Sequence, residues 1–357
     1  MSHLELVKAA LAEDSAILVS SEVNQRWLTN FDFSDGYVLV TKGGSYLMTD
    51  FRYIEAAEAE ADKGFNILMP GGRKMLEEVS AKINENGVKT LLIEEATLSV
   101  SGFERIKAAL PGINVTLGGS SIIEGLRRSK DETEIEKIKR AQALTDAAFE
   151  HILGYITPER TEIDVALELE FFMRSRGAEG IAFSTIAVSG SASSMPHGVP
   201  RPVKLEKGFL TMDYGAKVDG YCSDMTRTVV IGKADEDMKR LYNTVLTAQT
   251  SALEAFYAGE RERKKLDTIA RDIIDNAGYK GCFGHSLGHG VGMYVHEAPG
   301  LSQAAPEGEL LKVGDVVTFE PGIYLSGKYG CRIEDMAVVT PDGTYNFTKS
   351  PKELIEI

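Results

Sequence analysis

Two linked segments, Gly288-His289-Gly290-Val291-Gly292 and His296-Glu297-Ala298-Pro299, decide how the C-terminal half of this chain is interpreted. Glycines on both sides of His289 let the backbone come close to a crowded site, and they argue against a helix. His285 and His289 are therefore not interpreted as a helical zinc pair. The helical metalloprotease pattern His-Glu-x-x-His is also absent, because Ala298-Pro299 follows His296-Glu297.

Four carboxylates occupy other short segments of the same half. They are Asp213 in Thr211–Gly215, Asp224 in Tyr221–Arg227, Glu320 in Phe319–Gly322 and Glu334 in Arg332–Asp335. An acidic residue at a strand end is usually a solvated turn residue, so the joint pattern is more specific than any member. Four carboxylates and the His289 imidazole are the ligands that two divalent cations sharing one site require.

Such a pair of cations has a known chemistry. Two metals roughly 3.5–4 Å apart share one water and lower its pKa toward neutrality, which supplies a nucleophile without a serine or cysteine. A single histidine among carboxylates favours Mn²⁺, Co²⁺, Fe²⁺ or Zn²⁺ over a thiolate-rich structural zinc site. We expect a binuclear metallohydrolase with two divalent ions, Mn²⁺ first among them.

The carboxylates follow a weak internal repeat. Leu205-Glu206-Lys207-Gly208 leads into a strand ending at Asp213, and Leu311-Lys312-Val313-Gly314 leads into one ending at Glu320. A second carboxylate follows each, Asp224 in the first case and Glu334 in the second. The repeat predicts two related halves around a pseudo-twofold site.

Further polar residues are candidates for the same site. Arg332 shares a strand face with Glu334, because residues two apart in a strand point the same way, and we expect it to pair with a ligand carboxylate. A lone histidine is more often structural than catalytic. However, His197, His285 and His296 lie, like His289, in turns rich in glycine and proline near the expected ligands. We interpret all four as functional.

Length and composition set broader limits. The 357 residues suggest two domains, and 43% hydrophobic with 26% charged residues is typical of a globular protein. The net charge of −14 argues against nucleic acid as a partner, because phosphate binding needs a basic surface. Neither a leader nor an apolar run near the ~20 residues of a membrane span is apparent. We expect no membrane association.

The number of cysteines indicates the compartment in which the protein works. Cys222, Cys282 and Cys331 form an odd, sparse set, which fits free thiols in a reducing, cytoplasmic environment. The simpler interpretation is that all three fill the core. The alternative is that one of them, Cys222, lines the site beside Asp224.

The first 125 residues are predicted to form a separate α/β domain. Strands are expected at residues 16–19, 37–40, 45–48 and 90–93, with a hairpin turn at 42–44 and helices at 51–61 and 75–86. Gly71-Gly72-Arg73 is interpreted as a turn rather than a phosphate cradle.

A second domain is predicted over residues 126–357. Ser129-Lys130-Asp131-Glu132 matches a capping box and should begin a long helix. Thr161 and Asp164 should cap a second helix that ends at Gly177. Strands and turns follow, with helices at 235–258 and 264–277. The apolar stripe expected on the first helix consists of Ile135, Ile138, Ala141, Leu144, Ala148 and Ile152.

In this order and spacing, the segments resemble the pita-bread metallopeptidases, which include methionine aminopeptidase, aminopeptidase P and prolidase. Residues 285–299, Glu320-Pro321-Gly322-Ile323-Tyr324 and Arg332-Ile333-Glu334-Asp335 are similar to the proline-peptidase branch, as is Pro196-His197-Gly198. The resemblance is strong over residues 125–345. It is weaker before them, where Trp27–Phe31 and Asp50–Tyr53 are similar to a creatinase-type N-terminal domain.

The resemblance implies an α+β pita-bread catalytic domain behind a smaller α/β domain. It also implies a ligand set, in which Asp213 and Asp224 hold one metal, His289 and Glu320 complete the other, and Asp224 and Glu334 bridge. Glu320 would also move a proton to the leaving amine. The remaining residues would contact the substrate or support the site, namely His197, His285, His296 and Arg332.

The implied reaction is hydrolysis of the Xaa-Pro bond by a hydroxide bridging two metals, by an Xaa-Pro aminopeptidase or an Xaa-Pro dipeptidase. Its substrates would be proline-containing peptides or dipeptides, and the protein would be a homodimer. An N-terminal domain disfavours methionine aminopeptidase, and the short chain disfavours the long eukaryotic prolidases. A metal-free, creatinase-like C–N hydrolase and a non-catalytic peptide-binding module are the alternatives, and both are disfavoured because all five metal positions are intact.

Overall fold

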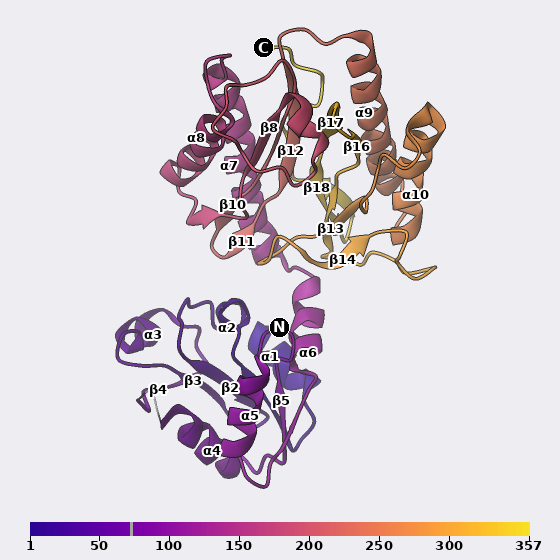
Figure 1. Ribbon diagram of the computed structural model, residues 1–357. Coiled ribbons are helices and arrows are strands. Elements are labelled where there is room, and N and C mark those ends of the chain that lie inside the picture. The colour runs from indigo at the N-terminus through magenta and orange to yellow at the C-terminus, as the bar shows by residue number, and fades with distance from the viewer. Residues whose placement is uncertain (72–73) are drawn as a thin grey trace. The chain divides into compact units, whose positions relative to one another are not determined.

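The protein, described here by a computed structural model over residues 1–71 and 74–357, divides into two units, Met1–Arg127 and Arg128–Ile357 (Figure 1). Both units mix helices with sheets, as expected for the α+β class. The turn predicted at 71–73 falls largely on residues 72 and 73, which lie outside the described residues.

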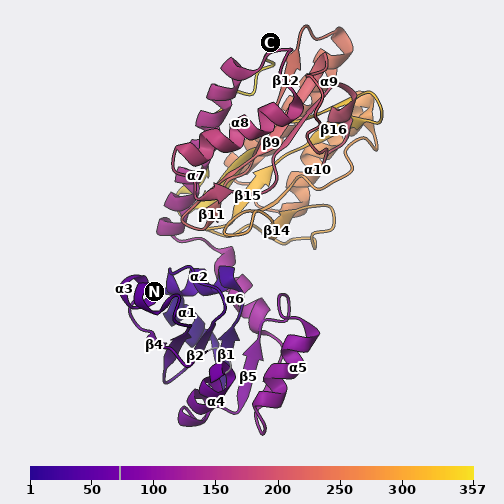
Figure 2. The same ribbon diagram turned by 60° about the vertical axis from the view of Figure 1, so that its left-hand side comes forward.

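A six-stranded sheet in the order β4-β3-β2-β1-β5-β6 forms the N-terminal unit, with helices around it (Figure 2). The strands predicted from short apolar runs are confirmed, and β2 and β3 pair as an antiparallel hairpin around the predicted turn. The strands are β1 Ser15–Val19, β2 Tyr37–Thr41, β3 Ser45–Met48, β4 Asn66–Leu68, β5 Thr90–Ile93 and β6 Asn114–Thr116. The helices are α1 His3–Ala10, α2 Glu22–Thr29, α3 Ile54–Glu60, α4 Met75–Glu85, α5 Val100–Ala109 and α6 Gly119–Arg128.

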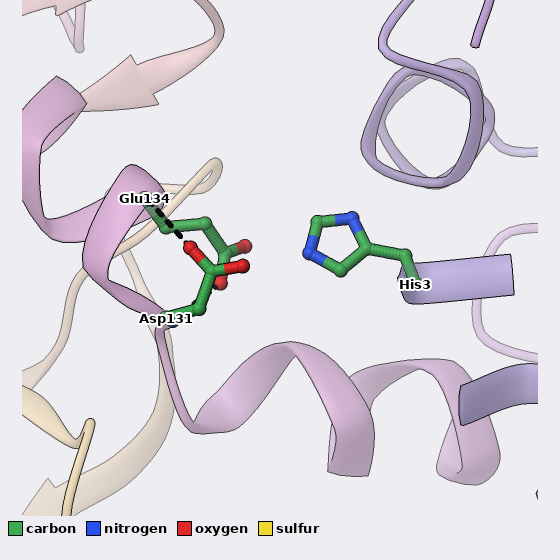
Figure 3. A group of neighbouring side chains, drawn as sticks. All are labelled: His3, Asp131 and Glu134. Carbon is green, nitrogen blue, oxygen red and sulfur yellow. Dashed lines mark hydrogen bonds between the residues drawn. The ribbon is translucent and has the colours of Figure 1, made fainter. Parts of the chain in front are cut away.

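The long helix α7 (Glu132–Tyr155) begins two residues later than Ser129 would have it, so that part of the prediction was wrong. Its capping box is Asp131 with Glu134, and each side chain accepts a hydrogen bond from the other's backbone N–H (Figure 3). Lys130 lies outside the helix because the backbone of Asp131 is extended, with φ of −80° and ψ of 176°. The predicted apolar stripe does face the core, where Ile138, Ala141, Ala148 and Ile152 are buried.

The other helices of this unit largely follow the prediction. Thr161 and Asp164 cap α8 (Glu162–Ser175), which ends before Gly177, a residue with φ of 108°. Asp235 caps α9 (Glu236–Tyr257). The last pair is α10 (Arg263–Ile274) and a short irregular turn over Asp275–Tyr279.

Two antiparallel strand pairs form the centre of the C-terminal unit. β9 (Gly208–Tyr214) pairs with β12 (Met225–Ile231), and β15 (Val316–Phe319) pairs with β18 (Asp335–Thr340). In each pair the first strand ends beside one expected ligand and the second begins directly after another. The halves predicted from the repeat are therefore present.

Additional strands extend these pairs. The sheet orders are β12-β9-β8, β14-β13-β15-β18-β19, β11-β10-β7 and β16-β17. The remaining bounds are β7 Gly180–Ile181, β8 Ile186–Ser189, β10 Ala216–Val218, β11 Tyr221–Cys222, β13 Gly288–Gly290, β14 Glu297–Leu301, β16 Gly322–Leu325, β17 Tyr329–Arg332 and β19 Gly343–Asn346, with a 3-10 turn at Gly190–Ser194.

Helices cover each half on its own side. α7 and α8 lie on one side of the strands and α9 and α10 on the other (Figure 1). Phe149 and Ile152 of α7 pack with Leu210 of β9, whereas Leu241 of α9 packs with Phe319 of β15. The two apolar layers leave the polar strand ends between them. None of the helices in the described residues is long and apolar enough to cross a membrane.

One buried cation joins the two halves to the C-terminal segment. Arg227 on β12 is almost fully buried, and its Nη2 donates to Asp335 at 2.8 Å and to the Ser350 carbonyl at 2.8 Å. Burial acts to raise the pKa of Asp335, but Arg227 and Lys352 outweigh it and hold that pKa below its ordinary value. Arg227 therefore stabilises the position of β18, the strand that follows Glu334.

We predict that Arg227→Met lowers the free energy of unfolding by about 3–5 kcal/mol, because the change leaves the Asp335 carboxylate with less compensation inside the protein. Chemical denaturation of the metal-free protein measures this. The matched control is Lys233→Met, since the Lys233 side chain is 86% exposed beside Glu356. Breaking that surface pair should cost far less, because solvent screens an exposed ion pair. Equal losses in the two variants would contradict the assignment.

Candidate metal centre

The strand ends between the two halves open into one cavity of about 470 Å³. Asp213 is the penultimate residue of β9, Asp224 directly precedes β12, and Glu320 directly follows β15. Glu334 lies between β17 and β18, and His289 is the middle residue of β13. All nine residues that the sequence singled out line this cavity, namely Asp213, Asp224, His289, Glu320, Glu334, His197, His285, His296 and Arg332.

Three of these residues are close enough to share one cation. Asp224, His289 and Glu334 each offer a ligand atom, and these atoms lie within 4.8 Å of one another. The Nε2 atom of His289 is 3.5 Å from Asp224 Oδ2 and 3.2 Å from Glu320 Oε1. This spacing suits oxygen and imidazole ligands around a divalent ion.

Two carboxylate oxygens show that the donor set fits a cation. Asp213 Oδ1 and Glu334 Oε1 are buried and have no hydrogen-bond partner among the described residues. A buried polar atom without a partner costs free energy, and the cost is larger for a charged group. Positive metal ions would satisfy both oxygens, whereas a purely structural cluster would leave them unpaired.

The electrostatics of the cavity lead to the same conclusion. Burial, followed by the neighbouring carboxylates, raises the pKa of Asp224 and that of Glu334 well above their ordinary values. Burial also raises the pKa of Asp213, against the opposing charge of Arg332. The cavity thus concentrates negative charge that its own cations do not balance, and added positive charge would stabilise the ionised forms.

His289 and Glu320 behave as a charge pair. Burial acts to raise the pKa of Glu320, but the hydrogen bond and positive charge of His289 lower it to about 2. Burial acts to lower the pKa of His289, and Glu320 raises it overall. Glu320 is therefore ionised, as a metal ligand must be.

Two threonines that the sequence analysis missed orient the ligands. Thr226 Oγ1 donates to Glu334 at 2.7 Å, and Thr318 Oγ1 donates to Glu320 at 3.1 Å. Thr226 lies on β12 two residues after Asp224, and Thr318 lies on β15 two residues before Glu320. The period-two alternation of strands was the pattern that could have identified them.

Two glycines allow β13 to lie close to both of its neighbours, β15 and β14, as the positions of these glycines beside His289 suggested. A Cβ atom on Gly288 would lie 1.9 Å from the Thr318 carbonyl oxygen, and one on Gly290 would lie 2.5 Å from that of Glu297. The His289 N–H donates to Thr318 Oγ1 at 3.0 Å. No larger residue fits at these two positions without moving the strand that carries His289.

A chain of hydrogen bonds forms one wall of the site. The Nδ1–H of His285 donates to the Ser286 carbonyl at 2.9 Å, so its Nε2 accepts from the Tyr324 hydroxyl at 2.9 Å. Arg332 donates to the Tyr324 oxygen at 2.9 Å and to Asp213 at 2.7 Å. Burial lowers the pKa of His285, which keeps it neutral. Tyr324 was not among the predicted site residues, because only tertiary structure brings it between His285 and Arg332.

The last two histidines face the cavity from loops. The ring of His296 lies 4.3 Å from that of His289, centroid to centroid, and burial lowers its pKa. His197 is exposed and follows Pro196. Cys222 does not line the cavity, because it is buried with its Sγ 3.5 Å from the Met293 carbonyl, and no disulfide forms among Cys222, Cys282 and Cys331.

Comparison with known proteins gives two family matches. The creatinase/prolidase N-terminal domain matches residues 6–129, and metallopeptidase family M24 matches residues 136–341. An Xaa-Pro dipeptidase of Pyrococcus horikoshii is 37% identical over 342 residues, covering 95% of this chain and 94% of the relative.

Solved structures of similar proteins cover nearly the whole chain. An Xaa-Pro dipeptidase from Bacillus anthracis superposes with a TM-score of 0.92 and 40% identity, covering 99% of each chain. An X-Pro aminopeptidase from Thermotoga maritima gives 0.90 and 35%, covering 98% of this chain and 99% of its own. The expected fold, a pita-bread domain preceded by a creatinase-type domain, is confirmed by these matches.

We predict that Glu334→Gln makes the metal-free protein more stable and removes its stabilisation by Mn²⁺. Glutamine is neutral and keeps an oxygen for Thr226, so it relieves the crowding of negative charge around Asp224. A gain of about 1 kcal/mol would raise Tm by about 2–4 °C for a unit of this size. Thermal unfolding with and without Mn²⁺ measures both effects, and undiminished stabilisation of the variant by Mn²⁺ would argue against a ligand role for Glu334.

Proposed function

Because the chain belongs to metallopeptidase family M24, we propose that it hydrolyses the bond between an N-terminal residue and proline, with two divalent metal ions. The observation that carries the proposal is the convergence of four carboxylates and His289 on one cavity, where two carboxylate oxygens have no protein partner among the described residues. Relatives named Xaa-Pro dipeptidase and X-Pro aminopeptidase along the whole chain support proline peptides as the substrate class.

We assign Asp213, Asp224, His289, Glu320 and Glu334 as the five side chains that would hold the two ions. The spacing of Asp224, His289 and Glu334 supports this arrangement. Mn²⁺ is the first choice, and Co²⁺, Fe²⁺ and Zn²⁺ are the alternatives for this donor set. When bound, such a pair of ions ionises a water at neutral pH and polarises the scissile carbonyl.

Glu320 is the residue that moves the proton. Its carboxylate is ionised beside His289 and accepts a hydrogen bond from Thr318, so its orientation is fixed. It takes the proton that the nucleophile loses and passes it to the proline nitrogen as the amine leaves. His197 and His296 lie on the cavity wall, where they hydrogen-bond to the substrate and stabilise the developing oxyanion.

The wall of His285, Tyr324 and Arg332 is the proline side of the site. An Xaa-Pro bond is a tertiary amide without an N–H, so the pocket that holds it needs no acceptor for that group. His285 is kept neutral and already hydrogen-bonded through both ring nitrogens, and it presents its ring to the pyrrolidine. Arg332 supports the wall and holds Asp213.

We further propose a cytoplasmic homodimer that acts on free peptides and has no nucleic-acid partner. The three cysteines form no disulfide with one another, which supports a reducing compartment, and the net charge of −14 opposes binding to polyanions. Size-exclusion chromatography with light scattering tests the dimer.

With Mn²⁺, the purified protein should release alanine from Ala-Pro, and His289→Ala and Glu334→Gln should each abolish that turnover. The loss follows because each change removes a ligand that the chain does not replace. Metal content is measured on every sample, which also separates this reaction from a metal-free hydrolase and from a peptide-binding module.

The control for this experiment is Glu236→Gln, an exposed change in which the side chain is 90% accessible. It should retain full activity. Full activity in a metal-analysed Glu334→Gln sample would defeat the proposed mechanism. Comparing Ala-Pro with Ala-Pro-Ala-Ala on the wild-type protein decides between dipeptidase and aminopeptidase.

A further inference from the structure

A hairpin carries two of the site histidines. β13 holds His289, β14 begins at Glu297, and the connecting loop at 291–296 ends at His296. The loop has no regular secondary structure of its own. Pairing of Gly290 with Glu297 closes the loop at its base, and contacts of other kinds hold the residues within it, where His296 faces the ring of His289.

The Glu297 carboxylate folds back into this loop. A Cβ atom on Gly292 would lie 2.2 Å from Glu297 Oε1, so glycine leaves the space that the carboxylate fills. The Tyr294 N–H approaches Glu297 Oε2 at 3.4 Å. On the other side, the Cys222 N–H donates to the Gly292 carbonyl at 2.8 Å. The loop is thus packed around a negative charge next to His296.

Lys130 balances that charge. Its Nζ lies 2.6 Å from Glu297 Oε1 and donates to the Arg128 carbonyl at 3.0 Å. The Lys130 side chain is 1% exposed and that of Glu297 is 12% exposed, so solvent screens the pair little. The backbone of Lys130 is itself fixed by its bond to the Gly314 carbonyl just before α7. The ammonium group therefore has a rigid support.

We propose that the Lys130–Glu297 ion pair positions His296 for hydrolysis of the Xaa-Pro bond, and this inference rests on the proposed function. Lys130 does not line the cavity, so it acts through the loop and not on the substrate. The pair fixes the residue next to His296, and the loop backbone transmits that constraint to the imidazole. Lys130 is in this sense a positioning residue.

The direct test is amide hydrogen exchange of the peptide covering residues 288–297. Lys130→Met should make this segment exchange at least about tenfold faster, because a buried carboxylate that loses its partner favours local opening. Lys130→Arg, which keeps the charge, should restore protection. The control is Arg201→Met, which also removes a cation from a buried glutamate, Glu162, but contacts no part of the hairpin. It should leave this segment unchanged.

The kinetic test uses Ala-Pro with Mn²⁺. Lys130→Met should lower kcat by about 10–100-fold with the metal content unchanged, as expected when a supporting residue is lost. In a His296→Ala background the same change should have little further effect, because both act through one imidazole. A residue important only for general stability would lower kcat equally in both backgrounds.

The outcomes distinguish a failure of the positioning role from a failure of the proposed function. Unchanged exchange in Lys130→Met, or additive losses with His296→Ala, would overturn the positioning role even if the wild-type protein cleaves Ala-Pro. A wild-type protein that cleaves neither Ala-Pro nor Ala-Pro-Ala-Ala would refute the proposed function, and it would also remove the catalytic part of the inference. The exchange result would then decide the structural part alone. If Lys130→Met does not fold, Glu297→Gln removes the same charge pair while keeping the side-chain shape, and the same results apply.

Discussion

The structure depends on holding four carboxylates together in one buried cavity. Burial and mutual repulsion both raise the pKa values of Asp224 and Glu334, so the fold must oppose these groups' tendency to separate or to take up protons. Arg332 and the two threonines supply part of the opposition through hydrogen bonds to Asp213, Glu334 and Glu320. Bound cations would supply the rest, because positive charge stabilises the ionised carboxylates.

The pseudo-twofold arrangement of the strands brings the four carboxylates together in the cavity. Each half offers one antiparallel pair, β9–β12 or β15–β18, and places its carboxylates where the strands end. Strand ends are free of ladder hydrogen bonds on one side, so their side chains can converge without breaking the sheet. The apolar layers under α7–α8 and α9–α10 then hold both halves rigidly, and Arg227 ties β12 to β18 across them.

Features that depend on residues close together in the sequence could be predicted, whereas features that depend on contacts between distant residues could not. Long helices with clear caps, such as α8, begin and end where expected, because their signals lie within a few residues. The start of α7 was misplaced, since Ser129 and Asp131 both match a capping box and only the extended backbone at Asp131 shows which of them begins the helix. The nine residues predicted for the site, all of which line the cavity, were singled out through their unusual neighbours. Lys130 was not, because its partner Glu297 is 167 residues away.

Buried carboxylates in the C-terminal unit differ in whether a cationic side chain lies beside them. Several buried carboxylates of the C-terminal unit have a cation beside them, such as Asp315 with Arg128 and Asp335 with Arg227 and Lys352. Among the described residues, the carboxylate oxygens that are buried without a partner belong to Asp213 and Glu334, and both residues line the same cavity. A fold that pairs its other buried charges and leaves these two oxygens unpaired keeps them available for an external cation. Framework pairs such as Lys130 with Glu297 then serve to keep that cavity in shape, since a rigid surround prevents unbalanced carboxylates from moving apart.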